Sequence, residues 1–278
     1  MSHDQYRGSK KHVLDLVASA DFVNTMNHLL GDTGISLSAA DPCQPGGYED
    51  AEEWTLRKFC RAHCENWFDF QPFDQWWVPD RYTNPQWDLL STCAIEGKKG
   101  LLMIEAKANE GELDRTGKSP PSGSAQSRKN HERIGECIAQ AARALGERLD
   151  SIGIHRDTHY QLSNRVASAW KLADCGLPVA LLYLGFTGDE GISDAGLPFV
   201  DHDHWQRVMG AYMDGILPLH FPDTVIRASG SGAMRLLIRS LPVLRCSPPR
   251  EQDWRSQSNR KEANDESLDG PRRQMGAG

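Results

Sequence analysis

The fold of this chain is decided by residues 87–108, WDLLSTCAIEGKKGLLMIEAKA. Leu89–Ile95 is an apolar run, and Gly97-Lys98-Lys99-Gly100 follows it with turn chemistry, because glycine accepts positive φ at low cost. A second run, Leu101–Ile104, is apolar at every position and therefore predicts a strand that is buried on both faces. The stretch predicts two antiparallel strands around a turn.

Charged residues stand at the end of the second strand, where an apolar core would otherwise continue. Glu105 and Lys107 lie two residues apart, so their side chains point to the same face of the sheet. With a turn centred near Gly97 and Lys98, Asp88 falls opposite Lys107 to within one residue. The sequence therefore predicts that two carboxylates and one ammonium converge at one end of a sheet.

This group of side chains suits a hard divalent cation. Mg²⁺ takes oxygen ligands, usually one or two carboxylates together with water and substrate phosphate. Such a cation polarises a phosphodiester and lowers the pKa of a bound water, and Lys107 could orient that water or stabilise charge on the phosphate. The structural alternative is a surface ion pair between Glu105 and Lys107, with Asp88 capping a turn.

The spacing resembles that of the PD-(D/E)xK nuclease superfamily. Sixteen residues separate Asp88 from Glu105-Ala106-Lys107, and the first motif reads Gln86-Trp87-Asp88, with Pro85 two places earlier than in the family pattern. The resemblance covers about residues 52–185. It implies an α/β, restriction-endonuclease-like fold with an α-β-β-β-α-β core, in which helices flank a central mixed sheet. It also implies phosphodiester hydrolysis with Mg²⁺, or Mn²⁺ as an alternative, held by Asp88 and Glu105, with Lys107 as a third catalytic residue.

The resemblance extends to the helix that follows the catalytic strand, where many members carry glutamine or tyrosine. The predicted helix 159–174 carries Gln161, which then joins the catalytic residues. Arg165 lies four residues later on the same helix face and, with Arg128 and Lys129, would hold the nucleic-acid backbone. The structural alternatives are that Gln161 caps the helix and that Arg165 forms a salt bridge.

Other segments have clear periodicity. Gln75–Pro79 is rich in aromatic residues and is expected to be the first strand, with its two tryptophans in the core rather than stacked on bases. Glu65 is a candidate for the acid that family members often carry before the sheet, and a solvated surface glutamate is the alternative. The remaining elements are predicted as helices at 11–30, 51–68 and 130–149 and strands at 179–185 and 234–241.

Length and composition indicate a globular chain. The 278 residues are 39% hydrophobic and 25% charged, and they divide into an N-terminal helix and loop (1–48), a nuclease-like domain (49–246) and a disordered tail (247–278). No apolar run approaches the roughly 20 residues of a membrane helix. The N-terminus lacks the pattern of a signal peptide, so we expect no membrane and a cytoplasmic protein.

The formal net charge of −7 is unusual for a protein that binds nucleic acid. The charges are unevenly distributed, however, and distribution matters more than the sum. Acidic residues crowd 49–53, whereas basic residues collect after the predicted site, at Arg115, Lys118, Arg128, Lys129, His131 and Arg133. We therefore expect nucleic acid as the partner, DNA rather than RNA, and leave a homodimer open.

Two further motifs could bind metal. Seven cysteines in no regular pairing fit a reduced protein, and Cys60 and Cys64 are expected to be buried thiols, because no second pair follows at zinc spacing. Asp201-His202-Asp203-His204 precedes a helical pattern, so Asp201 is expected to cap that helix rather than bind metal.

Three functions fit the sequence. The first is a metal-dependent nuclease that uses Asp88, Glu105 and Lys107. The second is a catalytically silent module of the same fold that binds nucleic acid or a protein. The third is a metal-dependent hydrolase of a small phosphorylated substrate.

Overall fold

The computed structural model describes residues 5–79, 84–189, 191, 196–230 and 232–243. Its centre is the predicted hairpin, in which β3 (Leu89–Ile95) runs antiparallel to β4 (Lys98–Lys107). Glu96 and Gly97 form the turn with φ of 50° and 77°, the left-handed pair that a two-residue hairpin turn requires. The hairpin prediction is confirmed.

The register of the hairpin differs from the predicted one by two residues. Ile95 pairs with Lys98, so continuing the ladder places Asp88 opposite Glu105 and not opposite Lys107. The turn begins one residue earlier than expected, since Glu96 accepts the left-handed conformation. A shift of two residues keeps every side chain on its face, so Asp88 still shares a face with Glu105 and Lys107.

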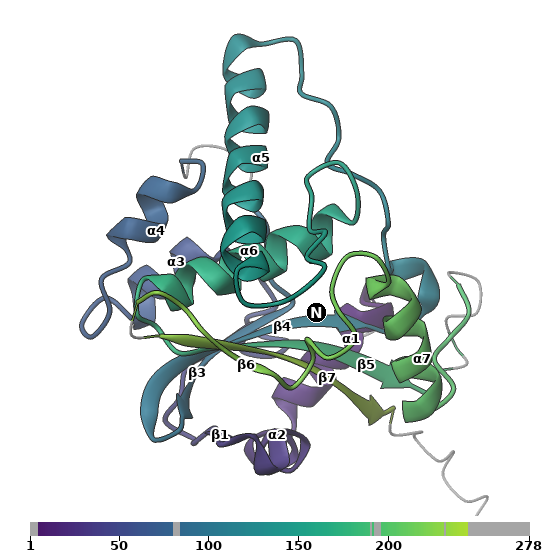
Figure 1. Cartoon of the computed structure of the whole chain (residues 1–278). Coiled ribbons are helices and arrows are strands. Elements are labelled where there is room, and N and C mark those ends of the chain that lie inside the picture. The colour runs from purple at the N-terminus through teal and green to yellow at the C-terminus, as the bar shows by residue number, and fades with distance from the viewer. Residues whose placement is uncertain (1–4, 80–83, 190, 192–195, 231, 244–278) are drawn as a thin grey trace, which may run out of the picture. The chain divides into compact units, whose positions relative to one another are not determined.

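The hairpin belongs to a mixed sheet of seven strands in an α/β fold (Figure 1). The strand order is β1-β3-β4-β5-β7-β6, and β2 also pairs with β3. Strands β4, β5 and β7 run parallel to one another, and the other pairs are antiparallel. The remaining strands span β1 (Ile35–Ser36), β2 (Cys43–Gln44), β5 (Val179–Thr187), β6 (Val225–Arg227) and β7 (Ala233–Pro242).

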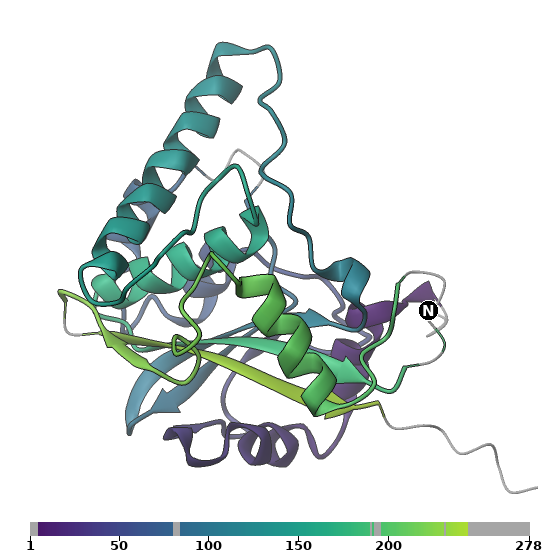
Figure 2. The ribbon, with the colours of Figure 1, turned by 45° about the vertical axis from the view of Figure 1, so that its right-hand side comes forward.

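Helices cover both faces of this sheet (Figures 1 and 2). One face packs against α1 (Gly8–Ala18) and α2 (Phe22–Leu30) through Leu102, Ile104 and Ala106. The opposite face, which includes Leu101, Met103 and Tyr183, packs against the helices that follow. These are α3 (Leu56–His63), α4 (Gln71–Trp76), α5 (Ala125–Gly146), α6 (Tyr160–Asp174) and α7 (His202–Met213).

Several element predictions are confirmed and others need correction. Helix α6 and strands β5 and β7 lie where the periodicity placed them. The predicted strand 75–79 is wrong, because residues 71–76 form α4; its tryptophans, Trp76 and Trp77, are nevertheless buried as expected. The single helix expected at 11–30 is two helices, and the one expected at 51–68 is confined to α3.

The predicted N-terminal segment, 1–48, contributes β1, β2, α1 and α2 to this sheet and its cover. The predicted tail, 247–278, lies outside the described residues. Across the described ranges, no helix combines the length and the apolar character needed to cross a membrane.

Candidate active site

The site forms where β4 ends, on the sheet face that α6 covers. Odd-numbered residues of β4 point to this face, because Leu101 and Met103 pack with the helices above it. Glu105 and Lys107 continue the same row of side chains along β4. Asp88 lies directly before Leu89, the first residue of the neighbouring strand β3. The alternation of a strand thus brings Asp88, Glu105 and Lys107 together under α6.

Asp88 is held by the backbone of β4. Its Oδ2 accepts a hydrogen bond of 2.7 Å from the amide of Ala106, and the residue is half-buried. Burial and then the negative charge of Glu105 raise the pKa of Asp88 to about 7, against the opposing effect of Lys107. Among the described residues no side-chain cation makes an ion pair with this carboxyl group.

Glu105 is buried and forms ion pairs with two cationic side chains. Lys107 Nζ lies 2.7 Å from Oε1, and Arg165 Nε lies 2.7 Å from Oε2. Burial alone would raise the pKa of Glu105, but Arg165 and Lys107 outweigh it and hold that pKa below its usual value. Burial likewise opposes the charge of Lys107, yet Glu105 and Asp88 raise the pKa of Lys107. The site therefore contains two carboxyl groups and two permanent cations.

Arg165 is part of this cluster rather than of an exposed surface. It is 5% exposed, its Nη2 donates to the carbonyl of Gln86 at 2.6 Å, and its guanidinium carbon lies 4.1 Å from the ring centroid of Trp87. The salt bridge considered for Arg165 is present, with Glu105 as the partner. Its Nη1 is buried and has no hydrogen-bond partner among the described residues.

Gln161 lies one helical turn before Arg165 on α6. It is half-buried, and its Oε1 has no hydrogen-bond partner among the described atoms. This unpartnered oxygen belongs to a residue on the helix face that carries Arg165.

Arg128 and Lys129 lie elsewhere. Both are exposed on the first turns of α5, whose N-terminal end stands away from the sheet in Figures 1 and 2. Arg128 donates to the carbonyl of Gly123 at 2.6 Å. The structure does not bring these two residues to Asp88 and Glu105.

The other acidic candidates have structural roles. Glu112 accepts hydrogen bonds from the amides of Ala108 and Ser9, and Asp114 accepts from Thr116. Glu65 is exposed beyond the end of α3. Asp201 caps α7 as expected, by accepting from the amide of His204 at 2.8 Å.

Tyr183 completes the site and was missed by the sequence reasoning, which treated it as one residue of a buried strand. It is the register partner of Glu105 on β5, lies fully buried on the same face, and has a hydroxyl without a partner among the described residues. The available signal was a hydroxyl-bearing residue within the otherwise apolar run 179–184.

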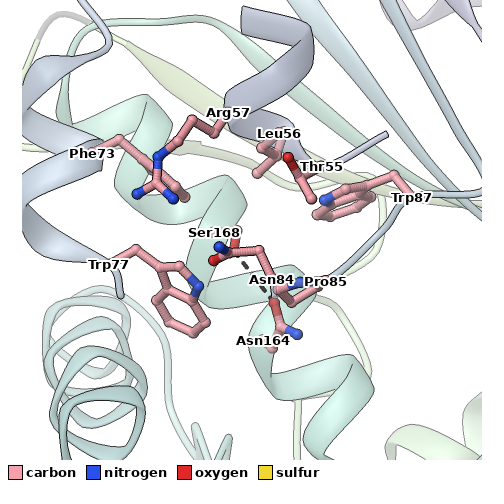
Figure 3. Close-up of a pocket in the computed structure, with 10 residues that line it drawn as sticks. All are labelled: Thr55, Leu56, Arg57, Phe73, Trp77, Asn84, Pro85, Trp87, Asn164 and Ser168. Carbon is pink, nitrogen blue, oxygen red and sulfur yellow. Dashed lines mark hydrogen bonds between the residues drawn. The ribbon is translucent and has the colours of Figure 1, made fainter. Parts of the chain in front are cut away.

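A separate small pocket lies beside the site and shares Trp87 with it (Figure 3). Trp77 and Trp87 lie on opposite sides of the pocket in this view, with the amides of Asn84 and Asn164 between them. Asn164 is buried on α6 and accepts a long 3.5 Å bond from Ser168. Helix α6, which also supplies Arg165 and Gln161, contributes Asn164 and Ser168 to the lining of this pocket.

A divalent cation fits the donors that Asp88 and Glu105 supply. Burial and then the charge of Glu105 raise the pKa of Asp88, and a cation bound beside the two carboxyl groups would favour the ionised form of both. No group of three or more His, Cys, Asp or Glu side chains with metal-binding geometry occurs among the described residues. Two carboxylates match Mg²⁺, which takes one or two of them and fills its shell with water and phosphate.

The ionisation of Asp88 gives a direct prediction. In the folded protein its carboxyl group should titrate near pH 7, and Glu105→Gln should lower that midpoint because a neighbouring negative charge is removed. Carbon-detected NMR of the labelled carboxyl group measures both. Since the folded pKa exceeds the unfolded value near 3.8, this group lowers stability as the pH rises from about 4 to about 7. A midpoint near 4 in both proteins would contradict the electrostatics described above.

Comparison with known proteins gives no assignment. No protein-family profile, characterised protein or solved structure matches this chain.

Proposed function

We propose that this protein is a metal-dependent nuclease that hydrolyses phosphodiester bonds, of DNA rather than RNA. The observation that carries the proposal is the convergence of Asp88, Glu105 and Lys107 at the end of a buried strand. Burying charged groups costs stability. A buried cluster of charges is therefore more often found where the protein needs it for function.

The fold supports the same proposal. The chain order of α2, antiparallel strands β2, β3 and β4, helix α6 and parallel strand β5 is compatible with an α-β-β-β-α-β core. In that core, we propose, Asp88 begins the second strand and Glu105 ends the third. The site lies at the carboxyl end of β4, where ligands of α/β sheets commonly bind.

Each residue then has a role. Asp88 and Glu105 would hold Mg²⁺ or Mn²⁺, which when bound supplies Lewis-acid activation of the phosphate and a more acidic water. Lys107, with its pKa raised, stays protonated and stabilises negative charge that develops on the phosphate. Gln161, with a free carbonyl oxygen, would orient the attacking water.

The charge balance of the site favours joint binding of metal and nucleic acid. With both carboxyl groups ionised, the two negative charges are balanced by Lys107 and Arg165. A divalent cation would therefore leave the buried site positively charged until a phosphodiester arrives. We propose that metal affinity is weak without nucleic acid and rises when a phosphate binds beside it.

Cleavage of a substrate panel tests this proposal. Single- and double-stranded DNA and RNA are incubated with the protein and Mg²⁺ or Mn²⁺, with EDTA as control. We expect metal-dependent cleavage of DNA that is lost in EDTA and in Lys107→Ala. Cleavage that persists equally in Lys107→Ala, or no cleavage by the wild type, would contradict the proposal.

The pairing of Glu105 favours a second candidate. Both of its oxygens already contact cations, as they would in a member of the fold that no longer needs a metal. A catalytically silent module that binds nucleic acid would retain nucleic-acid binding without cleavage and without any effect of Mg²⁺ on its thermal unfolding.

A further inference from the structure

Two buried hydrogen-bond donors flank Glu105 and have no partner among the described residues. One is the hydroxyl of Tyr183, and the other is Nη1 of Arg165. The Nε of Arg165 donates to Glu105, and its Nη2 donates to the carbonyl of Gln86. The guanidinium is thus fixed in place while its buried Nη1 has no partner among the described residues. Buried donors without a partner are rare in folded proteins, because each costs free energy, and a bound water, ion or ligand can satisfy them.

The two donors lie on the same side of the sheet. Tyr183 is the register partner of Glu105 on the adjacent strand, and Arg165 reaches the same glutamate from α6 above. Burial, then Tyr212 and Glu105, raise the pKa of Tyr183 well above its usual value, so the phenol keeps its proton and can donate it in a hydrogen bond. Asp88 is only half-buried, so solvent reaches the site beside Glu105.

We propose that the Tyr183 hydroxyl and Arg165 Nη1 form an anion subsite that takes a non-bridging oxygen of the scissile phosphate. This inference rests on the proposed nuclease function and extends it to a residue outside the superfamily motif. A guanidinium suits phosphate because its hydrogen-bond donors lie in a fixed plane. Donors that are already in place for the charge that develops on phosphate lower the barrier without reorganisation.

Tyr212 provides a matched control. It is 1% exposed on α7, and its hydroxyl donates to the carbonyl of Asp114 at 3.0 Å. Burial and then the charge of Glu105 raise the pKa of Tyr212. Tyr212→Phe therefore removes a hydroxyl with a partner, whereas Tyr183→Phe removes one without. If both were merely structural, Tyr212→Phe would destabilise the protein and Tyr183→Phe would not.

The first measurement is thermal unfolding in EDTA with inorganic phosphate or with potassium chloride at equal ionic strength. We expect phosphate to raise the melting temperature of the wild type and of Tyr212→Phe, and to have no effect on Tyr183→Phe. This readout needs neither metal nor cleavage, so it separates the subsite from the nuclease proposal. A phosphate effect that persists in Tyr183→Phe, or its absence in the wild type, overturns the subsite.

The second measurement is single-turnover DNA cleavage with Mg²⁺. We expect Tyr183→Phe to lose about a hundredfold in rate, as for loss of one preorganised donor, and Tyr212→Phe to stay within a few-fold of the wild type. If the wild type does not cleave but the phosphate effect depends on Tyr183, the subsite stands and the nuclease proposal fails. If Tyr183→Phe does not fold, its hydroxyl has a structural partner and the subsite proposal fails.

Discussion

Replacing Asp88 with asparagine is expected to abolish Mg²⁺-dependent cleavage, by about a thousandfold or more, while the folded protein becomes slightly more stable. Activity falls because asparagine removes one of the two carboxylates that hold the cation. Stability rises because the fold opposes ionisation of Asp88, whose pKa is about 7. Asparagine keeps an oxygen for the amide of Ala106.

The sign of the stability change depends on pH. Below about pH 4 the carboxyl group is protonated in both the folded and the unfolded states, so the variant should match the wild type. Above about pH 7 the wild type carries a charge that is costly in the fold, and Asp88→Asn should gain about 1 kcal/mol after allowance for solvent at this half-buried group. Urea denaturation at pH 4 and pH 8 measures this difference. A loss of stability at pH 8 would mean that Asp88 has a structural role.

Replacing Arg165 with methionine should have the largest effect on stability. Glu105 is 1% exposed and would lose one of its two counter-charges, and breaking a buried ion pair costs about 3–5 kcal/mol. The free energy of unfolding, measured by urea denaturation at pH 7, should fall by that amount. The matched control is Arg128→Met, which alters an exposed arginine and should change stability by about 0.5 kcal/mol or less.

A second substitution separates charge from packing. Adding Glu105→Gln to Arg165→Met removes the buried carboxylate that has lost one of its two counter-charges, and should restore much of the lost stability. If Arg165→Met unfolds at the same urea concentration as Arg128→Met, the buried pair does not hold α6 on the sheet. Arg165 would then not be a counter-charge that Glu105 needs in the folded protein.

Local pattern was sufficient to predict the hairpin, α6 and β5, because each has an apolar run with clear turn residues at its ends. The convergence of Asp88 with Glu105 followed from the side-chain period of two along a strand. That inference survived the error in register, since a shift of two residues preserves the face. The segment 75–79 was mistaken for a strand because aromatic residues favour strands, whereas burial against α5 and α6 stabilises α4 and the turn after it.

The partners of the site could not be predicted in the same way. Arg165 and Glu105 are 60 residues apart, and nothing local indicates that their side chains meet. The role of Tyr183 depends on parallel pairing of β4 with β5, which sets it beside Glu105 only once the register is known. Arg128 and Lys129 were grouped with the site because they follow it in sequence, but α5 carries them away from the sheet.

The central claim is that Asp88 and Glu105 form a metal site that cleaves phosphodiesters. Its most direct test is single-turnover cleavage of DNA with Mg²⁺ by the wild type, Asp88→Asn and Asp201→Asn. Asp201 caps α7, and asparagine caps helices as well as aspartate, so this control makes the same chemical change with little effect on the fold. We predict that the wild type and Asp201→Asn cleave at similar rates and that Asp88→Asn is inactive. Equal cleavage by all three proteins, or by none of them, would contradict the claim.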